Sequence, residues 1–162
     1  MVEPGEPEEW EDSYRTIGQF MSTDLFTVKP DDLIDLAASV MDWRHIRHVP
    51  VEDEEGRLVG LITHRNLLRV LNIGNRTNSD APTTVREVMI ENPVTVSPSI
   101  SSLEAIQIMR DNRVGCLPVV ENNQLMGIVT SYDFLEASAR LFQQHLAAPV
   151  DEQKSRATAN GA

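Results

Sequence analysis

The 162-residue chain is poor in cysteine and in aromatic residues, and it has no long hydrophobic run. Its one cysteine, Cys116, excludes an internal disulfide. No stretch approaches the ~18 consecutive apolar residues that a membrane-spanning helix needs. Residues 1–11 lack the basic and apolar regions of a secretory signal. The sequence therefore predicts a cytoplasmic protein with no membrane partner.

Basic residues are also scarce. There are 14 Lys and Arg against 25 Asp and Glu, and the formal net charge of −11 opposes binding to nucleic acid or to an anionic membrane. Residues 1–13 are rich in acids and contain no base, so we expect a disordered acidic tail there, and a flexible tail over 147–162. Because 41% of the residues are hydrophobic, the remainder is typical of a soluble globular protein.

The chain contains an internal repeat. A shift of 68 positions aligns residues of the same kind at the same spacing: Met21 with Met89, Pro30 with Pro98, Ala37 with Ala105, Met41 with Met109 and Pro50 with Pro118. A turn one residue shorter in the second repeat changes the shift to 67, which aligns Gly60 with Gly127 and Asn66 with Asp133. Two copies of one structural unit are therefore predicted.

Each repeat is predicted to form strand, helix, strand, strand, helix. Pro30 and Pro98 end the first strands, and the apolar residues over 33–41 have the spacing of one buried helical face. The next two strands form a hairpin, and the apolar run 58–62 is typical of a strand covered on both faces. This pattern predicts a mixed α/β (α+β) fold with repeats at 14–72 and 85–146.

The segment between the repeats, 73–84, is predicted to be a linker. Thr84 followed by Glu87 is the pattern of a capping box, so a short helix is expected to begin there. The last helix is lengthened by Leu135, Phe142 and Leu146, an apolar stripe that belongs either to the core or to an interface.

The order P-x₆-A-x₃-M, then h-P-V, then G-h-h-[TS]-x-x-[DN], where h is apolar, occurs in both repeats. It resembles the CBS domain, and the tandem arrangement over 17–142 resembles a pseudo-twofold Bateman module. The resemblance implies a regulatory module without catalysis, which binds adenine nucleotides (AMP, ADP or ATP) in a cleft between the repeats. It also implies that the bound state is transmitted to a partner or an attached domain.

Thr130 and Asp133 are the main candidate binding residues. A hydroxyl and a carboxylate at a strand-to-helix junction can bind the two hydroxyls of a ribose, or they can simply cap the helix. The resemblance implies that ribose binds here, and that the base lies beside four residues of the first repeat: Thr27, Val28, Val49 and Pro50.

Arg47 and His48 match the phosphate-contacting positions of the family, with a surface role as the alternative. A guanidinium binds phosphate with two hydrogen bonds, and His48 is expected to add charge as the pH falls toward an ordinary histidine pKa of about 6.5. A weaker mirror site is expected at Thr63, Arg65, Asn66, Thr95 and Val96. There an amide replaces the carboxylate and Gly115-Cys116 replaces the basic pair; Arg65 either reaches a phosphate or is solvated.

Other chemistry is not predicted. His45 and His48 have no acidic or cysteine partner that would complete a metal site, and Cys116 is expected to be a small core residue. The chain is therefore expected not to be an enzyme, to have no catalytic cofactor and to form a homodimer. Two alternatives remain: a dimerisation scaffold with a vestigial cleft, and the regulatory half of a larger enzyme. The sequence leaves open which adenosine ligand binds, S-adenosylmethionine included, and which protein is regulated.

Overall fold

The computed structural model describes residues 14–74 and 82–146. The predicted tails at 1–13 and 147–162, and residues 75–81 of the predicted linker, lie outside the described residues. The chain forms two compact units, Met1–Thr130 and Ser131–Ala162. Each unit is described by itself below.

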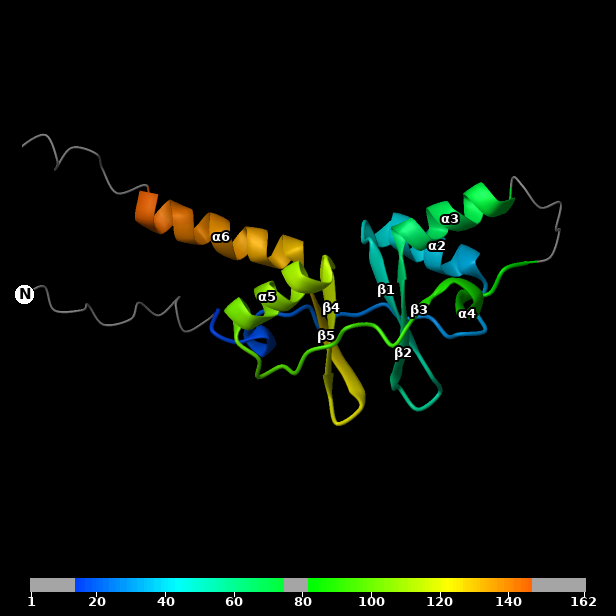
Figure 1. The fold of residues 1–162 in the computed structure, drawn as a ribbon, viewed down its shortest axis with the longest axis horizontal. Coiled ribbons are helices and arrows are strands. Elements are labelled where there is room, and N and C mark those ends of the chain that lie inside the picture. The colour runs from blue at the N-terminus through cyan, green and yellow to red at the C-terminus, as the bar shows by residue number, and fades with distance from the viewer. Residues whose placement is uncertain (1–13, 75–81, 147–162) are drawn as a thin grey trace, which may run out of the picture. The chain divides into compact units, whose positions relative to one another are not determined.

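The described residues form two antiparallel sheets and the helices that follow or precede their strands (Figure 1). In chain order the elements are η1 (Ile17–Gln19), α2 (Ile34–Arg44), β1 (His48–Glu52), β2 (Leu58–Thr63), α3 (His64–Gly74), α4 (Val85–Val88), β3 (Ile90–Glu91), α5 (Ser102–Asn112), β4 (Cys116–Glu121), β5 (Gln124–Thr130) and α6 (Ser131–Leu146). The sheets have the orders β1-β2-β3 and β4-β5. The predicted mixed fold, with helix, hairpin and helix occurring twice, is confirmed.

The predicted first strand of each repeat is only a single bridge. The N–H of Val28 donates to the carbonyl of Pro50, and the N–H of Val96 donates to that of Pro118, both at 3.1 Å. Each bridge runs parallel to the hairpin strand beside it. The return hydrogen bonds come from the N–H groups of Glu52 and Val120, at 3.0 and 2.9 Å. The ladder does not extend toward the preceding residues because Pro50 and Pro118 have no N–H to donate.

Two segments pack against the repeat to which they do not belong in sequence, and we call 16–22 and 84–91 the exchanged segments. Ser22 and Ile128 of β5 exchange backbone hydrogen bonds of 2.9 and 3.0 Å. In the other direction, Ile90 of β3 pairs with Leu61 of β2. Each small sheet is thus completed by the start of the other repeat.

The two exchanged segments make equivalent contacts, as the shift of 68 positions requires. The N–H of Ile17 donates to the carbonyl of Ile100 at 3.1 Å, and the N–H of Val85 donates to that of Asp32 at 2.8 Å. The predicted capping box is confirmed, because Thr84 donates from its backbone N–H to the Glu87 carboxylate at 2.6 Å. The hydrogen bonds from the Thr84 N–H and hydroxyl lower the pKa of Glu87.

Glycine allows the exchanged segments to approach the hairpins closely. A Cβ on Gly60 would lie 2.5 Å from the sulfur of Met89, and a Cβ on Gly127 would lie 2.7 Å from the sulfur of Met21. Both distances are far below van der Waals contact, so a larger residue would push the segment away. Close packing of each methionine against the glycine of the other repeat therefore explains why both repeats have Met and Gly at these positions.

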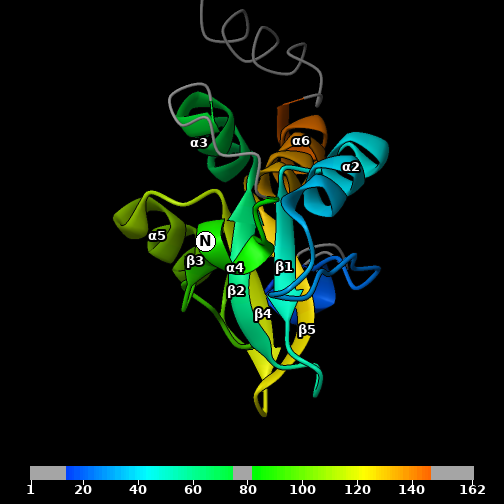
Figure 2. The same cartoon turned by 90° about the vertical axis from the view of Figure 1, so that its right-hand side faces the viewer.

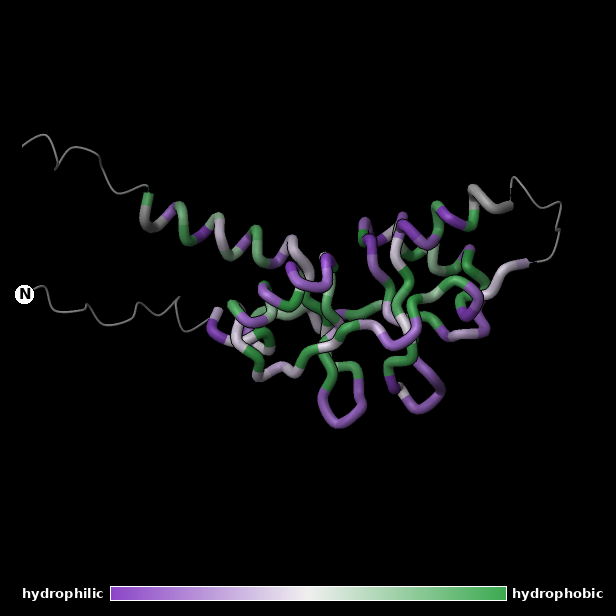
Figure 3. Tube along the Cα trace, viewed as in Figure 1, coloured by the Kyte–Doolittle hydropathy of each residue, from purple (hydrophilic) through white to green (hydrophobic). Residues whose placement is uncertain are grey.

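The core of the first repeat lies between its helices and its hairpin. It contains eight buried residues, and one of them, Val85, comes from an exchanged segment: Val28, Ala37, Val40, Met41, Val49, Val51, Ile62 and Val85. Figures 1 and 2 show α2 and α3 at the end of the hairpin where β1 begins and β2 ends, away from the turn. Figure 3 shows hydrophobic strands and hydrophilic turns, which agrees with this placement.

In the second unit, α6 has the extended length that the sequence predicts. Its three stripe residues, Leu135, Phe142 and Leu146, are all exposed, so they are surface residues rather than core. None of the helices in the described residues has the length and apolar character needed to cross a bilayer.

Candidate functional site

A polar junction forms in the first repeat where β2 ends and α3 begins. The backbone N–H and the hydroxyl of Thr63 donate to Oδ1 of Asn66 at 2.9 and 2.6 Å. The N–H of Asn66 lies 3.3 Å from the hydroxyl oxygen of Thr63. This reciprocal cap holds the Asn66 side chain, which is only 9% exposed, in one orientation.

The cap leaves one polar group of Asn66 for a ligand. Its Oδ1 already accepts two hydrogen bonds, whereas its amide nitrogen donates to no group in the described part of the chain. An amide N–H₂ donates to a hydroxyl or phosphate oxygen, while a carboxylate would accept from a hydroxyl. The junction can therefore bind a sugar or a phosphate as a donor.

Basic residues from two elements meet at this junction. His48 begins β1 and is paired with Thr63 across the ladder. The carbonyl of Arg47 accepts a 3.0 Å hydrogen bond from the N–H of His64, the first residue of α3. Arg47, His64 and Arg65 are exposed. On an otherwise acidic chain, the two arginines at a helix N-terminus favour an anion.

Arg47 and His48 lie beside Thr63 within the first repeat, because His48 is paired with Thr63 across the hairpin. Their use at the site of Thr130 and Asp133 stays a prediction. The sequence alone assigns no role to His64. Its position directly after β2 nevertheless indicates that it lies near the start of β1, the strand paired with β2.

The pKa of His48 is lower than the sequence predicts. Burial, followed by the charges of His64 and Arg47, lowers it from 6.5 to about 4. At neutral pH His48 is therefore an uncharged imidazole, which can donate one hydrogen bond and accept another. In the unliganded chain at pH 7, His48 therefore supplies hydrogen-bonding groups rather than positive charge to the junction.

The predicted base-contacting residues line the core of the first repeat. Val28, Val49 and Pro50 are buried, and Thr27 is half-buried. In the second repeat Thr95 is exposed, and Val96, the equivalent of Val28, is buried. A base placed along either segment would therefore contact the threonine and the backbone more than the valine side chains.

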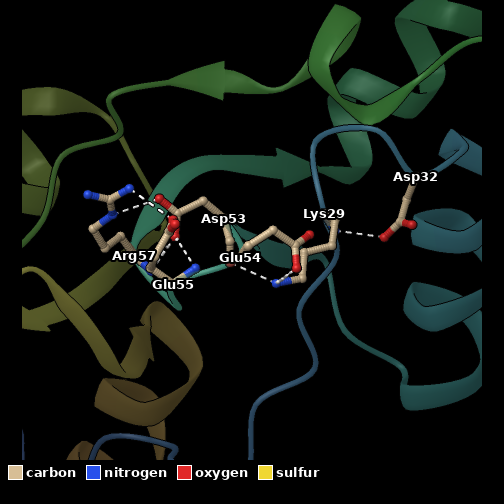
Figure 4. Close-up of polar contacts among 6 residues, drawn as sticks. All are labelled: Lys29, Asp32, Asp53, Glu54, Glu55 and Arg57. Carbon is tan, nitrogen blue, oxygen red and sulfur yellow. Dashed lines mark hydrogen bonds and ion pairs between the residues drawn. The ribbon is translucent and has the colours of Figure 1, made fainter.

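Ion pairs at the β1–β2 turn hold the segment that carries Thr27 and Val28. Figure 4 shows Lys29, whose backbone N–H donates to Asp32 at 2.7 Å and whose ammonium donates to the carbonyl of Asp53 at 2.7 Å. Asp53 also accepts from the guanidinium of Arg57 at 2.7 Å. Burial raises the pKa of Asp53, but hydrogen bonds from Arg57 and the Glu55 N–H outweigh it and the net shift is downward. These charged side chains are therefore paired with groups of the turn itself, and they stabilise its conformation.

Thr130 and Asp133 lie on either side of the boundary between the two units. Thr130 ends β5, where it is paired with Cys116, and Asp133 lies in the first turn of α6. The predicted use of Asp133 together with Thr27 and Arg47 stays a prediction. Cys116 is buried, as expected. Among the described residues, no group of three His, Cys, Asp or Glu side chains is placed to hold a metal.

The fold and its junctions define a tandem-repeat α/β module in which each repeat carries the same strand-to-helix motif. The chain belongs to the CBS domain family: the family model matches residues 17–73 and 85–140. Both repeats are therefore CBS domains, and the resemblance found in the sequence is confirmed.

Two curated relatives differ in how much of their length the chain covers. Over 114 residues it is 37% identical to inosine-5'-monophosphate dehydrogenase of Methanocaldococcus jannaschii, spanning 70% of this chain and 21% of that protein. It is also 37% identical over 114 residues to the CBS domain-containing protein YhcV of Bacillus subtilis, spanning 70% of this chain and 78% of YhcV. The match to the dehydrogenase therefore covers only a small part of that enzyme.

Solved structures of CBS domain pairs share the fold. CBSX2 in complex with AMP is 26% identical, with a TM-score of 0.70, covering 78% of this chain and 98% of that one. The CBS domain pair of MJ0100, in complex with 5-methylthioadenosine and S-adenosyl-L-methionine, is 27% identical, with a TM-score of 0.67 and the same coverage. The ligands of both proteins contain adenosine.

Proposed function

We propose that this chain is a non-catalytic, cytoplasmic regulatory module that binds an adenine nucleotide at its strand-to-helix junctions and passes the bound state to a partner or an attached domain. The observation that carries the proposal is the basic junction of the first repeat, where Arg47 and His48 at the start of β1 lie beside the Thr63–Asn66 cap, and Arg65 precedes Asn66 in the first turn of α3. The adenosine ligands of CBSX2 and of the MJ0100 domain pair support the ligand class.

The charge of the junction favours a nucleotide over S-adenosylmethionine. The two ligands share adenosine but differ at the 5' position, where a nucleotide carries an anionic phosphate and S-adenosylmethionine carries a sulfonium cation. Arg47 and Arg65 can bind the phosphate with charge-assisted hydrogen bonds, and they would repel the sulfonium. We therefore expect AMP, ADP or ATP to bind more tightly than S-adenosylmethionine.

The binding of adenosine ligands is tested by calorimetric titration with AMP, ADP, ATP, adenosine and S-adenosylmethionine. We expect saturable binding of the nucleotides. Asp133→Ala, which removes the predicted ribose contact, should weaken AMP binding about tenfold or more. Glu136→Ala, which removes an exposed acid on the same helix, is the matched control and should leave binding unchanged. If none of the nucleotides binds at concentrations up to millimolar, the proposal is wrong.

The role of Arg47 is tested by comparing AMP with adenosine. Arg47→Ala should weaken AMP about tenfold or more, because a charge-assisted bond to the phosphate is lost, and should leave adenosine affinity nearly unchanged. Arg110→Ala on α5 removes an exposed arginine from the second repeat and serves as the control for net charge. Equal losses for AMP and adenosine would contradict a phosphate contact.

The exposed stripe of α6 favours a second candidate function, a homodimeric scaffold. Leu135, Phe142 and Leu146 recur on one side of the helix and are all exposed. If titrations detect no ligand while sedimentation shows a stable dimer, the scaffold replaces the sensor as the better account. A chain that both dimerises and binds a nucleotide would be compatible with the sensor and with the scaffold.

A further inference from the structure

The cap at the start of α3 presents hydrogen-bond donors where the equivalent junction of the second repeat presents an acid. At the shift of 67, Asn66 corresponds to Asp133 and Arg65 corresponds to Tyr132. Asp133 is the acidic residue of the first turn of α6, whereas the first turn of α3 contains no acid. The two junctions therefore share their place in the repeat but suit ligand groups of different charge.

The Asn66 side chain is fixed in orientation by Thr63. The backbone N–H of Thr63 can only donate, so the atom that faces it at 2.9 Å must be the amide oxygen of Asn66. The Thr63 hydroxyl donates to the same oxygen at 2.6 Å. The amide nitrogen, on the other branch of the planar amide group, is thereby directed away from these two donors. It has two N–H groups to donate.

The Asn66 nitrogen is accessible although the residue is almost fully buried. Asn66 is 9% exposed. Among the described residues, each fully buried polar atom of a side chain has a hydrogen-bond partner. The Asn66 nitrogen has none in that part of the chain, so it must lie where solvent reaches it. A donor that is held in place without a partner is typical of a binding site.

The backbone at the start of α3 supplies a second donor. The first four N–H groups of a helix have no acceptor within it, and three of them find one elsewhere in this junction. The N–H groups of Thr63 and Asn66 donate to each other's side chains. That of His64 donates to the Arg47 carbonyl. The N–H of Arg65 has no acceptor among the described residues, and the exposed guanidinium of the same residue is a third donor.

We propose that the junction of the first repeat binds a nucleotide whose ribose carries a phosphate group on its 2' or 3' oxygen. This ligand preference rests on the proposed function, which places an adenine nucleotide at the strand-to-helix junctions. A carboxylate accepts hydrogen bonds from two free ribose hydroxyls and repels a phosphate, whereas amide, backbone and guanidinium donors bind phosphate oxygens. Dinucleotide-binding folds follow the same rule, since an acid contacts the free ribose and an arginine accommodates a 2'-phosphate.

The other charges of the junction are compatible with a ligand that has phosphates at both ends of its ribose. Arg47 directly precedes β1 and is joined to α3 through its carbonyl, which leaves its side chain to bind the 5' phosphate. Over its described length α3 contains no Asp or Glu, and its N-terminus favours negative charge. Adenosine 2',5'-bisphosphate and adenosine 3',5'-bisphosphate are simple ligands of this kind.

Calorimetric titration of the full chain with AMP, ATP and the two adenosine bisphosphates tests this preference. We expect one bisphosphate to bind at least about tenfold more tightly than AMP, because it adds charge-assisted hydrogen bonds. The isomer that does so identifies whether the 2' or the 3' oxygen carries the recognised phosphate. ATP is the charge control, because it has a similar negative charge with all of its phosphates on the 5' oxygen. It should bind less tightly than the preferred isomer.

Asn66→Asp copies Asp133 of the second repeat and tests the donor without removing the cap. A carboxylate can accept from the Thr63 N–H and hydroxyl as the amide oxygen does, so the melting temperature should be nearly unchanged. The variant should bind the preferred bisphosphate at least about tenfold more weakly, because a like charge replaces a donor. AMP has two ribose hydroxyls that can donate to the carboxylate, so it should bind at least as tightly as before.

The guanidinium of Arg65 is tested by a second variant. Arg65→Tyr, which copies Tyr132, should weaken the preferred bisphosphate more than it weakens AMP. Arg69→Gln is the matched control, because it removes an exposed arginine one turn further along α3. This control should leave the ratio of the two affinities unchanged.

The side-chain N–H signals of Asn66 in nuclear magnetic resonance spectra report the contact directly. They are assigned by their absence from the spectrum of Asn66→Asp. The preferred bisphosphate should move them to lower field as they donate to its ribose phosphate, and AMP should move them less.

Each possible failure has a distinct meaning. AMP binding as tightly as both bisphosphates, or ATP binding as tightly as the preferred isomer, would overturn the recognition of a ribose phosphate and leave the proposed function intact. A bisphosphate preference that survives Asn66→Asp, or that leaves the Asn66 signals unmoved, would place the extra phosphate elsewhere and would also overturn it. If none of the four ligands binds, both proposals are wrong.

Discussion

Acidification from pH 6.5 to about 4 is expected to destabilise the folded chain by at most about 3 kcal/mol through His48 alone. In this window the unfolded chain holds a proton on His48, whereas the folded chain keeps the imidazole neutral because it is buried and faces His64 and Arg47. The unfolded state therefore binds more protons, and stability rises with pH. The destabilisation through His48 is absent above the pKa that His48 has in the unfolded chain. It is complete below the pKa that His48 has in the folded chain.

Urea unfolding as a function of pH measures this effect, with His48→Gln as the comparison. The many carboxylates of the chain also titrate at low pH, and Glu52 does so earlier than usual because burial raises its pKa. Subtracting the variant's curve from that of the unchanged chain removes their contribution. The difference should be flat above pH 6.5 and fall steadily toward pH 4. A flat difference across that range would mean that His48 is charged in the fold.

A neutral His48 also bears on how the junction would bind the proposed nucleotide. At pH 7 Arg47 and Arg65 contribute positive charge, and His48 contributes hydrogen bonding. A phosphate beside His48 would favour the protonated imidazole and raise its pKa. Saturating AMP should therefore reduce the acid sensitivity that the unliganded chain shows, which links the stability measurement to the proposed site.

Most of the fold could be predicted because its elements are encoded locally. The apolar positions over 33–41 specify one face of α2, and the alternation of apolar strands with charged turns specifies both hairpins. The capping box of Thr84 and Glu87 and the repeat shift of 68 were also readable from residue identity and spacing alone. These features depend on neighbours in sequence, and the structure contains all of them.

The exchange of segments could not be predicted in the same way. Ile17 and Val85 are both apolar residues at the start of a short helical turn, and nothing in either neighbourhood specifies which repeat will bury it. That choice is made by long-range packing, in which Met21 fits against Gly127 and Met89 fits against Gly60. The predicted first strands are present only as single bridges, because Pro50 and Pro118 lack the N–H that a longer ladder needs.

The position of Arg47 and His48 within the first repeat follows from the hairpin. In an antiparallel hairpin the start of the first strand faces the end of the second, so His48 lies opposite Thr63. The shared use of both basic residues with Thr130 and Asp133 stays a prediction. The register follows from the hairpin alone, and it required no knowledge of the ligand.

The exchanged segments give the mutation with the largest expected effect on stability. Ile17 is fully buried at the start of the segment that completes the second repeat. Ile17→Ala should lower the free energy of unfolding by about 2–5 kcal/mol, since it removes buried methyl groups and leaves a cavity. That is a large fraction of the roughly 5–15 kcal/mol that stabilises a typical domain. Urea unfolding of the full chain measures the loss.

The matched variant Ile17→Val keeps the branched shape and should cost only about 0.5–1.5 kcal/mol. Hydrogen exchange locates the damage, because the N–H groups of Ser22 and Ile128 each donate to the carbonyl of the other residue, joining the exchanged segment to β5, and should exchange faster in Ile17→Ala. The amide of Val28, bonded to Pro50 in the first repeat, is the internal reference. If Ile17→Ala lost no more stability than Ile17→Val, or if the Ser22 amide kept its protection, the segment would not be anchored by Ile17.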